Sequence, residues 1–152
     1  MAMRIETFLK QSPMFCVSLV ARRFDALTTR LLETDSLNFL EALILATLFF
    51  ESPVQVKPSQ LAEVFGTTRG NVSHCISSLE ARGFVQRRID PQDARAYQLA
   101  LKASGKKTAI RVIGALDKVQ REFEDEVGKE ALKSALAVIR LLGDRCPGPD
   151  AR

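Results

Sequence analysis

Apolar residues recur at three- and four-residue steps over most of the chain, which predicts a mainly helical protein. The first stripe follows Ser12-Pro13 and runs to about residue 33. Serine followed by proline is typical of a helix start, because the hydroxyl caps the helix and proline lacks only an N–H that is unpaired there. A second helix is predicted from Asn38, whose spacing from Glu41 resembles a capping box. Apolar residues nearly encircle this helix over 42–50, so we expect it to be buried.

The pattern changes in the middle of the chain. Two short helices separated by a tight turn are predicted over 58–65 and from 69 to about 82. Alternating apolar and polar residues on both sides of a turn at 90–93 predict a β-hairpin that ends near Leu101. The β-prone residues 54–57 suggest a further minor strand.

Two more helices are predicted near the C-terminus, one from about residue 103 and one after Gly128. Because neither an internal repeat nor a linker is visible, we expect one domain over residues 1–152. Its fold class is mainly α with a small β-hairpin (α+β), in which outer helices surround a helix-turn-helix and the hairpin.

Residues 58–82 have the spacing of a helix-turn-helix. The two helices of this motif cross closely, so the first needs a small inward residue, the turn a residue that tolerates positive φ, and the second an aliphatic inward residue. Ala62, Gly66 and Val72 meet these needs. Advancing by about 100° per residue from Val72 gives the outward and N-terminal residues of the second helix. They are Arg69, Gly70, Asn71, Ser73, His74 and Ser77.

This outward set is short and polar, whereas a helix that merely faces water more often carries Glu and Lys. Ser, Asn and Arg side chains can reach phosphate oxygens or base edges, so we predict that the set binds DNA in the major groove. Gly70 costs up to about 1 kcal/mol inside a helix, which a close backbone approach to DNA would explain. The alternative is a solvated helix in a winged-helix module that binds protein without DNA.

The hairpin offers a second candidate contact. Arg87 and Arg88 are neighbours on a strand and lie on opposite faces, so we expect only one of them to face DNA. Arg95 follows the turn, and an arginine at a protruding tip suits a narrow minor groove. Asp93 is placed to pair with Arg95 and support the tip. The alternative is a surface ion pair with no role in binding.

Composition limits the functions to consider. The three cysteines are widely spaced and His74 is the one histidine, which fits neither a disulfide framework nor a metal site, so we expect no metal and no cofactor. The sequence has no nucleophile elbow, phosphate loop or zinc-protease motif, so we expect a protein that is not an enzyme. The longest apolar stretch, 42–50, is too short to span a membrane, and no secretory signal is visible, so we expect a cytoplasmic protein.

The net charge of +4 is unevenly distributed. Residues 66–111 hold nine Lys and Arg against three Asp and Glu, whereas residues 1–57 hold six of each. We therefore expect the positive charge to gather on one DNA-facing surface.

Residues 37–105 resemble the MarR family of winged-helix transcriptional regulators. The resemblance rests on Pro58-Ser59-Gln60-Leu61-Ala62, on Leu79-Glu80 with Arg82-Gly83, and above all on Asp90-Pro91-x-Asp93-x-Arg95-Ala96. It implies a winged helix-turn-helix over about 54–101, in which the hairpin is the wing. It also implies a homodimer built from helices over about 8–34 and 103–144.

The resemblance further implies a sequence-specific regulator that binds a pseudo-palindromic operator in double-stranded DNA. Such a protein is expected to be a repressor, released by a small effector of the aromatic or phenolic acid type or by thiol oxidation. Four departures from the family pattern suggest that the second helix of the motif makes fewer DNA contacts. His74 and Ser78 stand where basic residues are common, Ala94 replaces a frequent Arg, and Lys102 replaces a frequent Thr.

Cys16 is the candidate redox sensor. It lies near the start of the first long helix, in a segment that weakly resembles the peroxide-sensing branch of the family, and a helix N-terminus favours the reactive thiolate. It also falls on the apolar stripe, and the tyrosines that assist that branch's cysteine are missing, since Tyr97 is the one tyrosine. The alternative is therefore a buried, unreactive Cys16.

Overall fold

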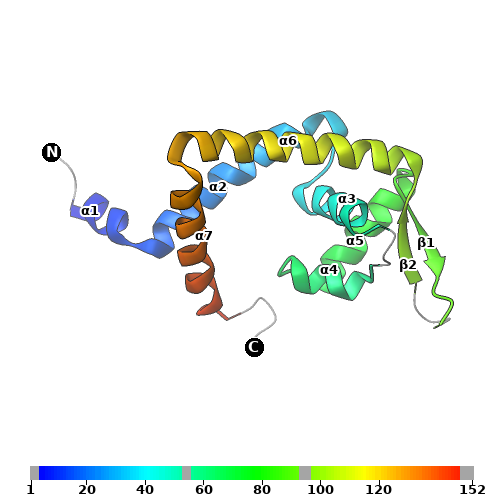
Figure 1. The fold of residues 1–152 in the computed structure, drawn as a ribbon. Helices are drawn as coiled ribbons and strands as arrows, with labels where there is room; N and C mark the ends of the chain where they lie inside the picture. Colours follow the sequence, from blue (N-terminus) through cyan, green and yellow to red (C-terminus); the bar gives the residue numbers. More distant parts are fainter. Residues whose placement is uncertain (1–3, 53–55, 93–96, 148–152) are drawn as a thin grey trace. The chain divides into compact units, whose positions relative to one another are not determined.

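The computed structural model describes residues 4–52, 56–92 and 97–147. The chain forms two compact units, Met1–Phe39 and Leu40–Arg152, and each is described by itself. Figure 1 labels the elements along the chain. Besides the helices, the described residues contain one two-stranded antiparallel hairpin. The predicted fold class, mainly α with a small β-hairpin, is therefore confirmed.

The first unit is helical. It contains α1 (Arg4–Gln11), α2 (Pro13–Leu32) and the short 3-10 helix η1 (Glu33–Asp35). The predicted cap is present, because the N–H of Phe15 donates to Oγ of Ser12 at 3.3 Å and Pro13 opens the helix. The separate helix α1 was not predicted. In this single chain Leu32 is the buried residue of α2, while most of its apolar stripe is exposed.

Helix α3 (Phe39–Glu51), which belongs to the second unit from Leu40 on, is a core helix. Ala42, Ile44 and Leu45 are fully buried in it, which confirms the expected position of this helix. Phe50 is an exception, because 67% of its surface is exposed. Glu41 is also buried, and its Oε2 lies 4.0 Å from Nη1 of Arg82.

The helix-turn-helix consists of α4 (Pro58–Val64) and α5 (Arg69–Ala81). Gly66 in the turn has φ +58°, and Oγ1 of Thr68 caps α5 by accepting from the N–H of Asn71 at 3.2 Å. Ala62 and Val72 are buried as predicted, and Leu61, Cys75, Ile76 and Leu79 are buried beside them. The motif predicted from the sequence is therefore confirmed.

The hairpin pairs β1 (Val85–Ile89) with β2 (Tyr97–Leu101), and its register places Val85 opposite Leu101 and Ile89 opposite Tyr97. The minor strand predicted over 54–57 is a single bridge between Val56 and Leu99, and residues 53–55 lie outside the described residues.

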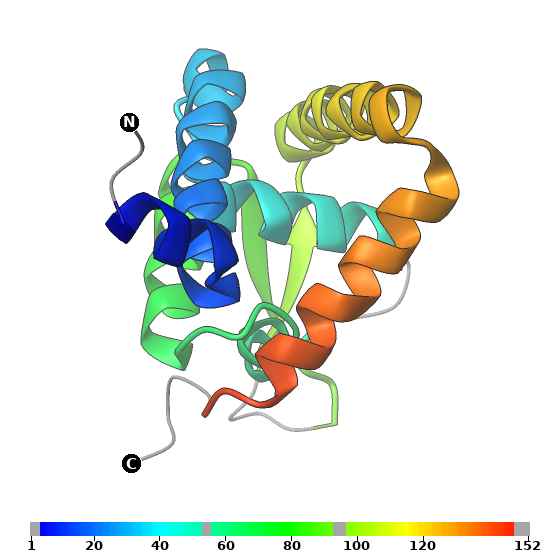
Figure 2. The ribbon, with the colours of Figure 1, turned by 90° about the vertical axis from the view of Figure 1, so that its left-hand side faces the viewer.

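Two long helices complete the second unit, α6 (Ala103–Val127) and α7 (Lys129–Asp144). Both views show the chain turning sharply between them, at Gly128, whose φ is +83° (Figures 1 and 2). No helix in the described part of the chain combines the length and the apolar character needed to cross a bilayer.

The start of α6 is fixed to the end of α5 and the base of the hairpin. The N–H of Lys102 donates to the carbonyl oxygen of Phe84 at 2.9 Å, and Oγ of Ser104 donates to the carbonyl oxygen of Gly83 at 2.6 Å. Gly105 packs directly on the Phe84 backbone, where a Cβ atom would overlap the carbonyl group. Helix α6 therefore begins at a fixed point beside the C-terminal end of α5.

Candidate nucleic-acid interface

The outward face of α5 is open to solvent. All six residues that the sequence places there are exposed: Arg69, Gly70, Asn71, Ser73, His74 and Ser77. The first turn of α5 carries no acidic side chain, so the partial positive charge of the helix N-terminus is not offset there. An anion such as a phosphate can approach this end of the helix without meeting a like charge.

The side chain of Asn71 already makes one hydrogen bond within the helix-turn-helix. Its Nδ2 donates to Oγ1 of Thr67 at 3.1 Å. The side-chain amide has two hydrogens and an acceptor oxygen, so one hydrogen and the oxygen are left for an outside partner. A base edge that offers both a donor and an acceptor matches this pair of groups.

Gly70 has no packing reason to be glycine. A Cβ atom built there would meet Oγ1 of Thr68 at 3.8 Å, an ordinary van der Waals distance. The helix itself therefore tolerates alanine at this position.

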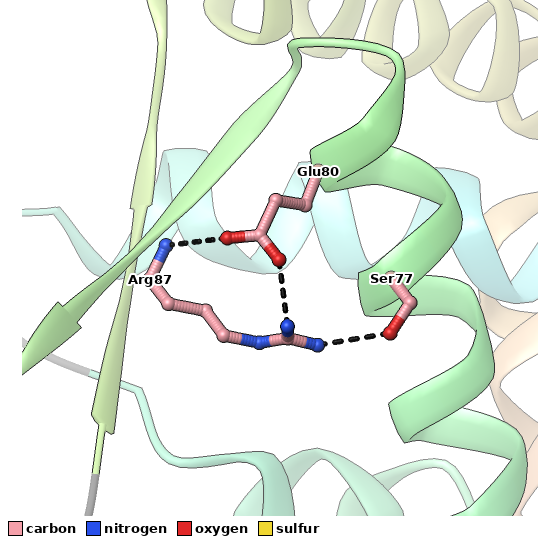
Figure 3. A network of polar contacts seen from close by, with 3 residues as sticks. All are labelled: Ser77, Glu80 and Arg87. Atoms are coloured by element: carbon pink, nitrogen blue, oxygen red, sulfur yellow. Dashed lines mark hydrogen bonds and ion pairs between the residues drawn. The ribbon is translucent and has the colours of Figure 1, made fainter.

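Arg87 links the hairpin to α5, as Figure 3 shows. Its Nη1 lies 2.6 Å from Oε2 of Glu80, and its Nη2 donates to Oγ of Ser77 at 3.0 Å. Its backbone N–H donates to Oε1 of Glu80 at 3.3 Å, and its Cζ lies 5.0 Å from the centroid of the Tyr97 ring. Two residues predicted as separate DNA contacts, Ser77 and Arg87, are thus bonded to each other.

Arg88 lies on the other face of β1, beside the side chain of Gln86. With the Gln86 amide oxygen turned toward it, Nε and Nη2 of Arg88 donate at 3.0 and 2.6 Å. The two arginines therefore take opposite faces, as strand alternation predicts. Arg88 is exposed and has a neutral neighbour, whereas Arg87 has an acidic one.

The turn of the hairpin is held at Asp90, a residue whose role sequence reasoning missed. Asp90 is 6% exposed; its Oδ1 accepts from the N–H of Gln92 at 2.9 Å, and its Oδ2 lies 3.7 Å from Nζ of Lys57. The first contact is a local aspartate turn. Asp93 and Arg95, predicted at the tip, lie outside the described residues.

The described basic residues of 66–111 lie on or beside α5, the hairpin and the start of α6. Lys102, Lys106, Lys107 and Arg111 lie at the start of α6, next to the hairpin base and the C-terminal end of α5. Arg69 lies at the opposite end of α5. Arg82 pairs with Glu41 and its Cζ lies 4.8 Å from the Phe84 ring centroid.

Two further expectations concern small molecules and redox chemistry. Cys16 is exposed, so the interpretation of a buried thiol is wrong for the single chain, whereas Cys75 is buried. A pocket of about 270 Å³ is lined by residues of α6 and α7 alone. Within the ranges that the structure describes, no group of His, Cys, Asp or Glu is arranged to hold a metal ion.

Known proteins share this architecture. The fold matches MepR of Staphylococcus aureus in a structure with DNA, at 16% identity and a TM-score of 0.81 over 89% of this chain and 98% of that one. A probable transcriptional regulator of Pseudomonas aeruginosa matches at 19% identity and a TM-score of 0.74, over 88% of this chain and 98% of that one. No match was found among curated protein sequences.

The sequence itself carries a family signature. Residues 37–97 match the MarR family, a stretch that runs from the start of α3 through the helix-turn-helix to the first residue of β2. This stretch is less than half of the chain, but it contains the whole outward face of α5 and the first strand of the hairpin. Over these residues, which include the helix-turn-helix and the first strand of the hairpin, the chain is similar to the MarR family.

Proposed function

We propose that this protein is a sequence-specific DNA-binding transcription regulator that inserts α5 into the major groove and uses the hairpin as a wing. The observation that carries this proposal is the exposed polar face of α5, with no acidic residue in its first turn. The MarR family match supports a regulator rather than an enzyme. The structure of MepR with DNA shows that a protein of this fold binds DNA, which supports the same role here.

We assign the groups by their chemistry. Arg69, Asn71, Ser73, His74 and Ser77 offer hydrogen bonds to bases and phosphates. Gly70 lets the helix backbone approach closely. Arg88 extends from β1, and we retain Arg95 at the tip, aimed by Asp93, from the sequence alone.

A homodimer is supported by apolar surface that the single chain leaves open. Helices α1 and α7 bury none of their residues, although both carry large apolar side chains. On α7 these include Val138, Ile139 and Leu141, which are 57%, 46% and 59% exposed. Contiguous apolar surface of this kind is typical of an interface. A dimer presents two copies of α5 to half-sites about one helical turn apart.

The regulatory part of the proposal is repression that a small aromatic or phenolic acid relieves. Thiol oxidation is the second route, and Cys16, near the start of α2, is its candidate sensor. In both cases the signal must lower the affinity for the operator, because an effector shifts an equilibrium only through its different affinity for the two states.

Sequencing of DNA selected by the purified protein tests the function. The proposal predicts enrichment of one pseudo-palindrome, bound with a Kd of about 10 nM or below. Parallel selections with peroxide and with aromatic acids should show less enrichment. If a folded dimer enriches no sequence at low salt, DNA binding is refuted. Protein partners that persist after nuclease treatment would then support a protein-binding module.

A further inference from the structure

We propose that Arg87 is a positioning residue, which holds the wing against α5 through Glu80 and Ser77, and that Arg88 is the cation that β1 supplies to DNA. This inference rests on the proposed DNA-binding function. Both arginines are candidate DNA contacts by sequence, and the inference gives each of them a different role.

The first step is the number of elements that meet at Arg87. Its guanidinium reaches Glu80 and Ser77, one helical turn apart on α5, and its Cζ stacks over the Tyr97 ring on β2. Its own backbone N–H is bonded to the same Glu80 carboxylate. Figure 3 shows the guanidinium between the strand and the helix. One side chain therefore sets the position of both strands relative to the recognition helix.

The second step is charge. The Glu80 carboxylate lies 2.6 Å from the Arg87 guanidinium, so the pair is neutral as a unit. A phosphate that took Arg87 from Glu80 would be left close to an unpaired carboxylate, and like charges at short range repel. If Arg87 exchanged the Glu80 carboxylate for a DNA phosphate, the wing would therefore gain no net attraction to DNA.

The third step is the contrast with Arg88. Arg88 is exposed on the opposite face of the strand and contacts the uncharged Gln86 amide. Among the described residues it forms no ion pair. Its charge is therefore available to a phosphate, and neutralising a phosphate releases a bound counterion.

The fourth step concerns Ser77. Its Oγ accepts from Arg87 at 3.0 Å, which occupies one of the two lone pairs of the hydroxyl. The hydroxyl hydrogen is left to donate, and a bond from a charged donor is stronger than one between neutral groups. Arg87 thereby orients Ser77 as a hydrogen-bond donor, which suits acceptors such as guanine O6 and N7, thymine O4 or a phosphate oxygen.

The test compares Arg88→Gln, Arg87→Gln and Glu80→Gln in the full-length protein. Affinity is measured for the selected operator and for a scrambled duplex, each over a range of salt concentrations. Arg88→Gln should reduce the slope of log K against log salt by about 1 and weaken binding to both duplexes. Arg87→Gln and Glu80→Gln should keep the wild-type slope and lower the ratio of operator to scrambled affinity by about tenfold.

A charge-swapped double variant, Glu80→Arg with Arg87→Glu, separates positioning from loss of folding. It restores the ion pair in reverse, so part of the lost affinity ratio should return. Thermal unfolding of every variant confirms that a folded protein is compared.

Opposite results overturn the proposal. If Arg87 contacts a phosphate, Arg87→Gln will lower the salt slope by about 1, and Glu80→Gln will strengthen binding because it frees the cation. Unchanged slope and unchanged ratio in both variants would also refute a positioning role. A wild-type protein that does not distinguish operator from scrambled DNA would instead refute the proposed function.

Discussion

At the scale of single residues, close packing decides where the long helix α6 begins. Gly105 sits in its first turns with its Cα against the Phe84 backbone, and a methyl group there would overlap the Phe84 carbonyl. The same carbonyl oxygen accepts from Lys102 at 2.9 Å, so it is fixed in place and cannot move aside cheaply. Glycine is required here by space, and not by backbone conformation.

We predict that Gly105→Ala lowers the free energy of unfolding by about 2 kcal/mol or more, since overpacking a fixed site forces the backbone to shift. Gly114→Ala on the same helix is the matched control. Nothing lies within 4 Å of a Cβ at Gly114, so alanine should stabilise the protein by about 0.5–1 kcal/mol. Urea unfolding measures both variants, and equal effects would contradict this account of Gly105.

Gly70 leads to the opposite expectation, because its surroundings have room for a methyl group. Gly70→Ala should raise the free energy of unfolding by up to about 1 kcal/mol through helix propensity. It should at the same time weaken operator binding, because the added Cβ lies where the helix backbone approaches DNA. Thermal unfolding and fluorescence anisotropy measure the two effects separately. A stabilised variant with undiminished affinity would show that DNA does not approach this position closely.

The sequence predicted those residues whose roles depend on near neighbours in the chain. The inward residues Ala62 and Val72 follow from helical spacing, and the cap at Ser12 follows from local hydrogen bonding. The partners of Arg87 and the reason for Gly105 do not follow, because both depend on how the chain returns after Gly83. Alternation showed that Arg87 and Arg88 take opposite faces, but not which face meets α5.

At the scale of elements, helix ends were well predicted where a cap or glycine marks them. Ser12 and Gly128 each stand at the boundary expected for them. Helix α1 was missed because its eight residues offer little more than two turns of periodicity. The single bridge at Val56 shows that β-prone residues alone do not establish a strand.

The N-cap of α5 gives a prediction at this scale. Thr68→Ala removes the acceptor for the Asn71 N–H and should cost about 1 kcal/mol of stability, whereas Thr68→Ser keeps the acceptor and should cost little. Chemical denaturation of the two variants provides the comparison. If alanine and serine were equally tolerated, the cap would have no energetic role.

At the scale of the whole molecule, the apolar patterns of α1, α2 and α7 exceed what one chain buries. The periodicity predicted helices correctly, but an apolar stripe does not reveal whether its partner belongs to the same chain. In the proposed dimer, a second copy covers the large exposed side chains of these helices.

The proposed dimer makes Ile139 on α7 a sensitive position. Ile139→Glu should weaken self-association at micromolar concentration, because it places a charge in an apolar contact. Val64→Glu is the control, since Val64 is 74% exposed and belongs to α4, which is not one of the proposed dimer helices. Sedimentation equilibrium distinguishes the outcomes. A dimer as tight as wild type after Ile139→Glu would place the interface elsewhere.

The most direct measurement of the central claim is the affinity of the wild-type dimer for its selected operator and for a scrambled duplex, titrated from low to physiological salt. We predict that the operator is bound at least a thousandfold more tightly than the scrambled duplex at physiological salt. Both affinities should fall steeply as salt rises, because phosphate contacts release counterions. Equal affinity for the two duplexes, or binding that does not respond to salt, would contradict the assignment of α5 and the wing as a sequence-reading DNA interface.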